Sequence, residues 1–232
     1  MDESIHTRLL EKAREYHTPQ AARDLLATHP PLIITGITAS GKDSVSKYIS
    51  ETSELYREVV THTTRPPRAG EVHTQHYHFV TEEDMLKLVE REEMIEVKLI
   101  HGETFYGTSI NAYRDVVNSG HRPLLVIDVQ GVDEITKYIE HARPIFLLPP
   151  SFNAWIERLE KRGRMSHPER LRRMNSARVE LEKTLNSNLF VLVVNHDIPR
   201  TAHEILSDAH DYSIQHHNRE TALLLIEHLR NI

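Results

Sequence analysis

The chain has 232 residues, a net charge of −6 and no cysteine, which excludes disulfides, zinc–cysteine sites and thiol catalysis. The negative charge argues against a general nucleic-acid binder, and no run of 18 apolar residues is available to span a membrane. The first ten residues also lack the apolar segment of a signal peptide. We therefore expect a cytoplasmic globular protein.

Residues 2–28 are expected to be helical, because apolar side chains recur there at helical spacing. Thr18 and Pro19 are expected to start a second helix, as its cap and first helical residue. We interpret residues 1–30 as an N-terminal helical extension packed on the main domain.

A glycine-bounded loop follows the apolar run at 32–35 and precedes a helix expected at 41–53. Strand, glycine loop, lysine and helix is the order of a P-loop, whose backbone N–H groups and helix N-terminus cradle a polyphosphate. Lys42 would reach the outer phosphates. Asp43 follows it, where the usual P-loop has a serine or threonine that binds Mg²⁺.

The next part of the chain predicts short strands and a rigid loop. Segment 63–71 cannot be helical, because Pro66 and Pro67 keep it extended. Strands are expected at 57–61, 75–80, 94–100 and 105–109, and helices at 81–92 and 110–119. The last two strands, joined by a turn at 101–104, are expected to lie in a lobe separate from any parallel sheet.

Continuous apolar runs at 123–128, 144–148 and 190–194 predict strands buried on both faces. Helices are expected at 132–141, from Ser151 through Leu159, from the break at 165–168 to about Leu185, and at 201–214 and 220–229. This alternation predicts a parallel α/β core. Asp128 ends the first of these strands, at the sheet edge where parallel sheets bind ligands.

The motifs and their order resemble guanylate kinases over about residues 31–210. The P-loop is followed by TTRPPRAGE at 63–71, by Tyr77, by YGT at 106–108, by IDVQG at 127–131 and by IFLLPPS at 145–151. The resemblance implies transfer of the γ-phosphoryl group of ATP to GMP or dGMP, giving ADP and GDP. It also implies an α/β P-loop kinase core with a parallel sheet flanked by helices.

The same resemblance implies a small mixed α+β GMP-binding lobe at about 62–110 and a helical lid at about 157–175. Residues 31–215 would form this domain, and 216–232 a C-terminal helix packed on it or on a partner. The chain would act as a monomer or a homodimer.

Site residues follow by resemblance. ATP would contact Gly36, Ile37, Thr38, Ala39, Ser40, Gly41, Lys42, Asp43, Ser44 and Asn195. GMP would contact Thr61, Arg65, Arg68, Glu71, Tyr77, Glu96, Tyr106, Thr108 and Asp128. The lid residues Arg158, Arg162 and Arg173 would close over the ATP phosphates and serve catalysis together with Lys42 and Arg65.

Physical chemistry supports the acceptor assignments. Two arginines on a proline-stiffened backbone suit a monophosphate, because guanidinium groups bind it through paired hydrogen bonds. By resemblance, Glu96 would accept from the guanine N1–H and amino group, a donor pair that AMP lacks. The segment between Glu96 and Tyr106 is one residue longer than the usual spacing. A solvent-facing Glu96 and solubilising arginines are the alternatives.

Magnesium, bound with ATP, is the expected cofactor, with Asp43 and Asp128 as candidate ligands. Asp43 can bind it directly or through water, Ser44 can replace the missing hydroxyl, or Asp128 and water can suffice. We expect a water-mediated role for Asp43 and an active enzyme.

Two rival functions remain. A non-catalytic protein-binding module of the same family usually lacks the P-loop lysine and the lid arginines, which this chain has. The substrate of a ribose 1,5-bisphosphate kinase contains no guanine. The presence of Glu96 and Tyr77 therefore favours GMP as the acceptor.

Overall fold

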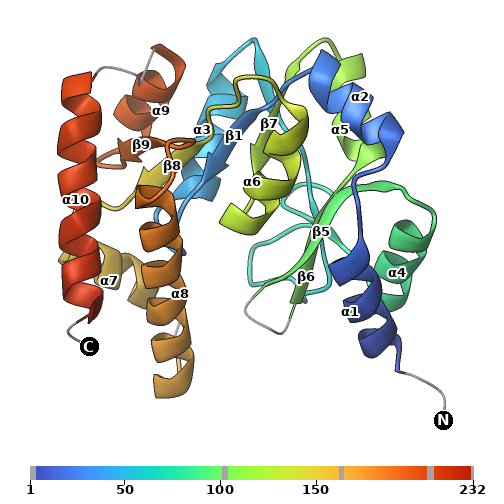
Figure 1. The fold of residues 1–232 in the computed structure, drawn as a ribbon, viewed down its shortest axis with the longest axis horizontal. Coiled ribbons are helices and arrows are strands. Elements are labelled where there is room, and N and C mark those ends of the chain that lie inside the picture. Colours follow the sequence, from blue (N-terminus) through green and yellow to red (C-terminus); the bar gives the residue numbers. More distant parts are fainter. Residues whose placement is uncertain (1–3, 101–103, 162–164, 208–211, 231–232) are drawn as a thin grey trace. The chain divides into compact units, whose positions relative to one another are not determined.

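The computed structural model describes residues 4–100, 104–161, 165–207 and 212–230. Two compact units divide the chain. Unit 1 comprises Met1–Pro31, Leu55–Pro123 and Gln130–His141, and unit 2 comprises Leu32–Glu54, Leu124–Val129 and Ala142–Ile232. Figure 1 shows the course of the chain through its elements. Among the described residues, none of the helices combines the length and apolar composition that crossing a bilayer requires.

Most of a parallel sheet belongs to unit 2, whereas its residues 56–58 and 122–123 belong to unit 1. The five-stranded sheet has the order β2-β7-β1-β8-β9. Its strands are β2 (Tyr56–Glu58), β7 (Arg122–Val126), β1 (Leu32–Thr35), β8 (Ile145–Leu148) and β9 (Val191–Val194). Ile34 pairs in parallel with both Val126 and Ile145. The parallel α/β core predicted from the buried apolar runs is therefore confirmed.

Five helices belong to the described part of unit 2. They are α3 (Lys42–Thr52), α7 (Phe152–Lys161), α8 (His167–Leu185), α9 (Ile198–Ser207) and α10 (Tyr212–Arg230). The long helices α8 and α10 pack against each other (Figure 1). Trp155 of α7, Leu181 of α8 and Leu225 of α10 meet in one buried apolar cluster with Phe146 of β8. This cluster anchors the helices on the sheet.

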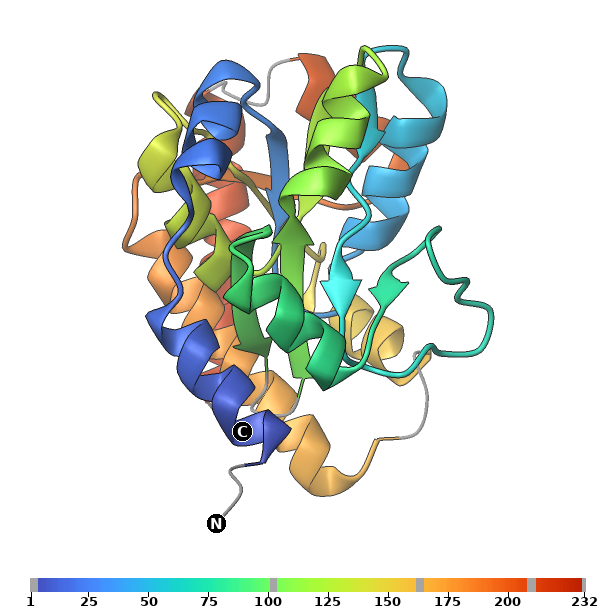
Figure 2. The ribbon, with the colours of Figure 1, turned by 90° about the vertical axis from the view of Figure 1, so that its right-hand side faces the viewer.

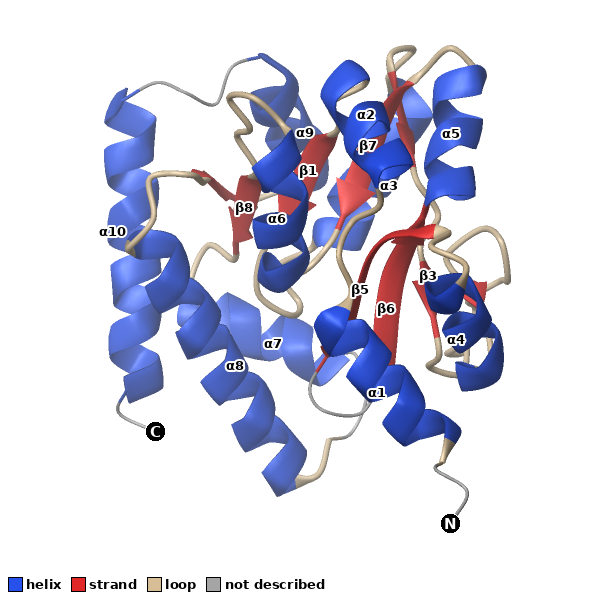
Figure 3. Ribbon diagram, turned by 45° about the vertical axis from the view of Figure 1, so that its right-hand side comes forward, coloured by secondary structure: helices blue, strands red, loops and turns tan. Residues whose placement is uncertain are grey.

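Unit 1 contains a smaller mixed sheet with the order β4-β3-β6-β5. Its strands are β3 (His62–Thr63), β4 (His78–Phe79), β5 (Met94–Ile100) and β6 (Thr104–Ser109). β3 and β4 are parallel, whereas β6 is antiparallel to β3 and β5. β5 and β6 are the long pair in Figure 3. In Figure 2, the loop that joins β3 to β4 extends away from both strands.

The other described helices belong wholly or mostly to unit 1. They are α1 (Ile5–Glu15), α2 (Gln20–Thr28), α4 (Glu82–Glu90), α5 (Ile110–Asn118) and α6 (Val129–Ile135), which continues into the 3₁₀ turn η1 (Thr136–Tyr138). Leu9 and Ala13 of α1 are buried against Met85 and Val89 of α4 and Phe105 of β6. The N-terminal helix is therefore part of the core of unit 1.

Two predicted strands are mostly wrong. Residues 59–61 form no strand between β2 and β3, and of segment 75–80 only His78 and Phe79 do. Thr74 has φ 68° and the His76 N–H donates to the Val72 carbonyl, so the chain turns where alternation suggested a strand. Alternation indicates an extended chain but does not supply a hydrogen-bonding partner.

Several helix boundaries also differ from the prediction. α6 starts at Val129 rather than 132, and α9 ends at Ser207 rather than 214. α10 then runs from Tyr212, so the helix predicted at 220–229 is only its second half. Thr18 does not cap α2. Its buried hydroxyl donates to Glu134, and the helix begins at Gln20. Of the predicted turn 101–104, only Thr104 is described, as the first residue of β6.

Candidate active site

The glycine loop of unit 2 connects β1 to α3. The Lys42 ammonium donates to the carbonyls of Gly36 (2.6 Å) and Ile37 (3.2 Å), across the loop. Gly41 precedes α3 with φ +101°, a conformation that side chains rarely adopt. A Cβ on Gly36 would lie 2.4 Å from the Leu147 carbonyl oxygen. The two glycines are therefore required by the backbone path.

Side chains from α7 and from the end of β9 hold this loop. The Trp155 indole N–H donates to the Thr38 carbonyl at 2.7 Å. Arg158 donates to the carbonyls of Ser40 (3.1 Å) and Asn195 (2.9 Å), and the Asn195 amide donates to the same Ser40 carbonyl at 2.8 Å. Side chains from distant parts of the chain thus preorganise the loop.

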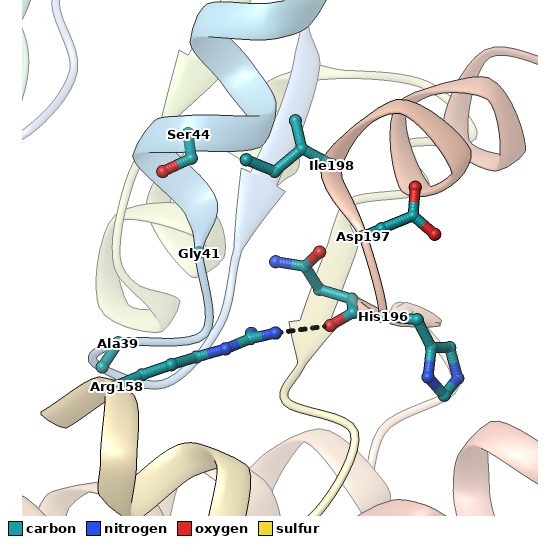
Figure 4. A pocket seen from close by; sticks show the side chains of 8 residues that line it. Ala39, Gly41, Ser44, Arg158, His196, Asp197 and Ile198 are labelled. Carbon is teal, nitrogen blue, oxygen red and sulfur yellow. Dashed lines mark hydrogen bonds between the residues drawn. The ribbon is translucent and has the colours of Figure 1, made fainter.

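A pocket of about 490 Å³ opens beside the loop (Figure 4). Its lining comprises Ala39, Gly41, Ser44, Arg158, Asn195, His196, Asp197 and Ile198. Ser44 contributes to the wall, whereas Asp43 is exposed in the first turn of α3. Figure 4 shows the Arg158 side chain extended along the pocket, with its guanidinium directed at the Asn195 main chain. The pocket therefore lies beside the glycine loop and combines apolar and polar lining atoms, as small-molecule sites commonly do.

Glu180, on α8, interacts electrostatically with both Lys42 and Asp128, and sequence reasoning identified only Asp128 of these two acids. The pKa of Glu180 is raised to about 7, chiefly by burial; Lys42 opposes the rise and the Asp128 carboxylate contributes to it. Asp128 follows β7 at the carboxyl edge of the sheet. Both acids therefore belong to the P-loop end of unit 2. Glu180 carried no sequence signal, because it is one of several acids on a strongly charged helix.

The predicted lid is described only in part. Arg162 lies outside the described residues. Arg173 on α8 donates to Glu169 at 2.7 Å, one turn away on the same helix. Arg158 donates to the Ser40 carbonyl of the glycine loop. Arg158 and Arg173 are therefore both engaged with protein atoms in this structure.

The acceptor residues of unit 1 form a cluster around Arg65. Its guanidinium donates to both carboxylate oxygens of Glu71 (2.8 and 2.9 Å) and to the Tyr106 hydroxyl (3.2 Å). The ring of Tyr77 faces the guanidinium at 5.5 Å. The Arg68 N–H donates to Glu71 at 2.6 Å, whereas the Arg68 side chain is exposed. Four of the predicted side chains thus meet in one place.

Charge neutralisation holds this cluster. Burial raises the pKa of Glu71, but hydrogen bonds from Arg65 and from the Arg68 main chain outweigh it and lower the pKa overall. Glu71 therefore stays ionised at neutral pH and fixes the orientation of the Arg65 fork. A guanidinium held in a fixed plane is prepared to bind an oxyanion through two parallel hydrogen bonds.

Glu96 is buried on the same sheet, with 4% of its surface exposed. The Thr108 hydroxyl donates to its carboxylate at 2.8 Å, and the two residues pair across β5 and β6. Tyr106 and Thr108 are two apart on β6, so both face the same side of the sheet. The Arg65 cluster and the Glu96 carboxylate therefore share one face. The alternative of a solvent-facing Glu96 is wrong.

Histidines lie beneath the loop that carries Tyr77. His62 and His78 stack with ring centroids 4.5 Å apart, and the buried His62 Nδ1 has no hydrogen-bond partner among the described residues. Burial, together with smaller contributions from His78 and His73, lowers the pKa of His62 to about 4. His62 is therefore neutral at physiological pH. Thr61, also buried, accepts the His78 N–H through its carbonyl at 2.8 Å.

The described side chains include two candidate magnesium ligands, Asp43 and Asp128. No group of three or more His, Asp or Glu side chains among the described residues is arranged to hold an ion. Asp128 and Asp43 do offer hard oxygen donors beside the P-loop lysine, and Mg²⁺ in kinases is bound by one or two carboxylates together with water and substrate phosphates. The residues present therefore fit a magnesium ion that arrives with a nucleotide.

Comparison with known proteins agrees with this geometry. A family model described as guanylate kinase matches residues 28–211. Guanylate kinase of Neisseria gonorrhoeae is 34% identical over 174 residues, covering 75% of this chain and 83% of that protein. Guanylate kinase 1 of Arabidopsis thaliana is 33% identical over 168 residues, covering 72% of this chain and 43% of that protein. The crystal structure of guanylate kinase from Anaplasma phagocytophilum aligns with a TM-score of 0.52 at 26% identity, covering 87% of this chain and 85% of that one. The chain therefore belongs to the guanylate kinase family.

Proposed function

We propose that this protein is a guanylate kinase that transfers the γ-phosphoryl group of ATP to GMP or dGMP, giving ADP and GDP. The observation that carries the proposal is the buried Glu96–Thr108 pair on the same sheet face as the Arg65 cluster. A carboxylate and a phosphate-binding guanidinium on one face match the two ends of GMP. A sugar phosphate would leave the buried Glu96 without a ligand partner.

Unit 2 supplies the donor half. Backbone N–H groups of the loop 36–41 and the N-terminus of α3 would hold the ATP phosphates, and Lys42 would exchange its loop carbonyls for phosphate oxygens. Asn195 and Ser44 line the pocket proposed for the nucleoside. Because the loop is already held by Trp155 and Arg158, little reorganisation is needed when ATP binds.

Unit 1 supplies the acceptor half. Arg65, Tyr77 and Tyr106 would hold the GMP phosphate, with Arg68 contributing its exposed guanidinium and Glu71 orienting Arg65. Glu96, which accepts from Thr108, would bind the guanine edge. Thr61 is close in sequence to the Arg65 cluster and would assist it. Phosphoryl transfer asks little covalent chemistry of the protein, so positioning and charge neutralisation account for catalysis.

The remaining assignments belong to the same proposal. Asp128 and, through water, Asp43 would hold Mg²⁺, which neutralises phosphate charge when bound. Residues of about 157–175 would act as a lid whose Arg162 and Arg173 stabilise the transferring group and whose closure excludes water. The GMP-binding lobe would span about 62–110. A cytoplasmic location suits an enzyme that consumes ATP.

ADP release in a coupled assay with ATP and GMP tests the proposal. Replacing Lys42 by alanine removes one donor to the transferring phosphates and should lower kcat by about 100-fold or more. The matched control is Lys47→Ala, which removes an exposed lysine paired with Glu51 on the same helix and should leave the rate unchanged. GMP-dependent ADP release that is equal in Lys42→Ala and the native protein would refute the proposal.

A further inference from the structure

The hydroxyl of Tyr16 binds both main-chain polar groups of one residue in the acceptor half. It donates to the Met94 carbonyl at 2.7 Å and accepts the Met94 N–H at 3.2 Å. Met94 is the first residue of β5. Tyr16 immediately follows α1 and is partly buried, so a residue from the N-terminal segment fixes the start of this strand.

The position that Tyr16 holds is an irregular one. Met94 pairs with Ser109 and Glu96 with Thr108, so the register shifts between Met94 and Glu96. Such an irregularity locally changes the twist of a strand and redirects the side chains beside it. The orientation of the Glu96 carboxylate therefore depends on how the backbone of Met94 is held, two residues earlier.

The helix that presents Tyr16 is firmly docked on unit 1. Leu9 is fully buried, Arg8 donates to Glu90 on α4 at 2.9 Å, and His6 lies 2.8 Å from Glu82. This segment precedes the part of the chain that the family model matches, 28–211. The contact therefore joins a residue outside the matched range, Tyr16, to one inside it, Met94.

Tyr16 and Glu96 also interact electrostatically. The pKa of Tyr16 is raised to about 12, chiefly by burial; the main-chain hydrogen bond with Met94 opposes this rise, and the carboxylates of Glu92 and Glu96 contribute to it. The phenol therefore remains protonated at neutral pH and keeps its hydrogen bond to the Met94 carbonyl.

We propose that Tyr16 is a positioning residue for acceptor specificity, which holds Met94 so that Glu96 is aligned with the guanine edge of GMP. The inference rests on the proposed role of Glu96. The N-terminal segment is then a specificity element of the acceptor half, and Tyr16 acts through Glu96 without touching the substrate.

Tyr16→Phe tests the proposal, because it keeps the ring and removes only the hydroxyl. Tyr113→Phe is the matched control, since the Tyr113 hydroxyl also donates to a main-chain carbonyl, that of His29, in the same unit. Steady-state kinetics would be measured with GMP and with IMP, which lacks the 2-amino group, and thermal unfolding would be followed for each variant.

Tyr16→Phe removes both hydrogen bonds to the Met94 main chain and should raise the KM for GMP about threefold to tenfold, with the KM for ATP unchanged. The preference for GMP over IMP should fall by a similar factor. Tyr113→Phe should lower the melting temperature without moving either quantity. A merely structural role for Tyr16 predicts the same behaviour as Tyr113, and that result would overturn the inference.

A double-mutant cycle with Glu96→Gln separates the inference from the function on which it rests. If Tyr16 acts through Glu96, Tyr16→Phe adds nothing to the KM for GMP in the Glu96→Gln background. Additive effects would overturn the inference and leave the role of Glu96 intact. If Glu96→Gln itself leaves GMP kinetics unchanged, the acceptor assignment fails, and the inference fails with it.

Discussion

Replacing Glu96 by glutamine should lower the activity with GMP and raise the activity with AMP. The carboxylate is buried and accepts from Thr108, and in the proposed function it would also accept from the two donors of guanine. An amide keeps one acceptor and turns the other into a donor, which then opposes a guanine N–H. Losing one charge-assisted hydrogen bond costs about 1.5–3 kcal/mol, so kcat/KM for GMP should fall by about 10- to 150-fold.

The same amide suits adenine, whose edge presents an acceptor at N1 and a donor at N6. Activity with AMP should therefore rise while activity with GMP falls. ADP release would be measured with each acceptor at saturating ATP, with Glu54→Gln, an exposed isosteric change, as the control. An unchanged ratio of GMP to AMP in Glu96→Gln would refute the assignment of guanine recognition to this carboxylate.

Three other substitutions test separate parts of the structure. Gly41→Ala places a Cβ 2.2 Å from the Asn195 amide, in a backbone conformation with φ +101°. It should raise the KM for ATP by about tenfold or more and leave the KM for GMP unchanged. An unchanged KM for ATP would contradict the preorganised loop. Asp43→Ser should alter the Mg²⁺ concentration for half-maximal rate, and an unaltered titration would remove Asp43 from the metal site. For His62, the folded pKa of about 4 lies below the unfolded value, so the unfolded state binds more protons between these values. Stability should therefore fall by about 2 kcal/mol from pH 7 to 5, and the fall should be smaller in His62→Phe; equal pH profiles by thermal unfolding would contradict the burial argument.

The parallel sheet could be predicted because its signals are local. The strand at 32–35, the glycine loop and the apolar runs at 145–148 and 191–194 each identify themselves within a few residues. Strands 57–61 and 75–80 could not be placed correctly from alternation. Whether an extended segment joins a sheet depends on a partner elsewhere in the chain, as the pairing of His62 with Gly107 shows.

Some residues of the candidate site could likewise be predicted from the sequence, and others could not. Lys42 and Arg65 belong to short motifs whose chemistry can be read from the sequence. Trp155, Glu180 and Tyr16 do not, because each reaches its position only when a helix packs on a distant segment. Trp155 contacts a carbonyl 117 residues away, and Tyr16 one 78 residues away. Such supporting contacts depend on tertiary packing, which no spacing of residue types encodes.

A comparison of acceptors tests the central claim most directly. The purified protein would be given ATP and Mg²⁺ with GMP, dGMP, AMP, UMP or ribose 1,5-bisphosphate in turn, and kcat/KM would be measured from ADP release. We expect GMP, or GMP and dGMP together, to exceed AMP and the sugar phosphate by at least about 100-fold, because only guanine offers the Glu96 carboxylate the N–H pair that the proposal assigns to it. A higher value for ribose 1,5-bisphosphate or AMP, or no turnover above that of Lys42→Ala with any acceptor, would contradict the account.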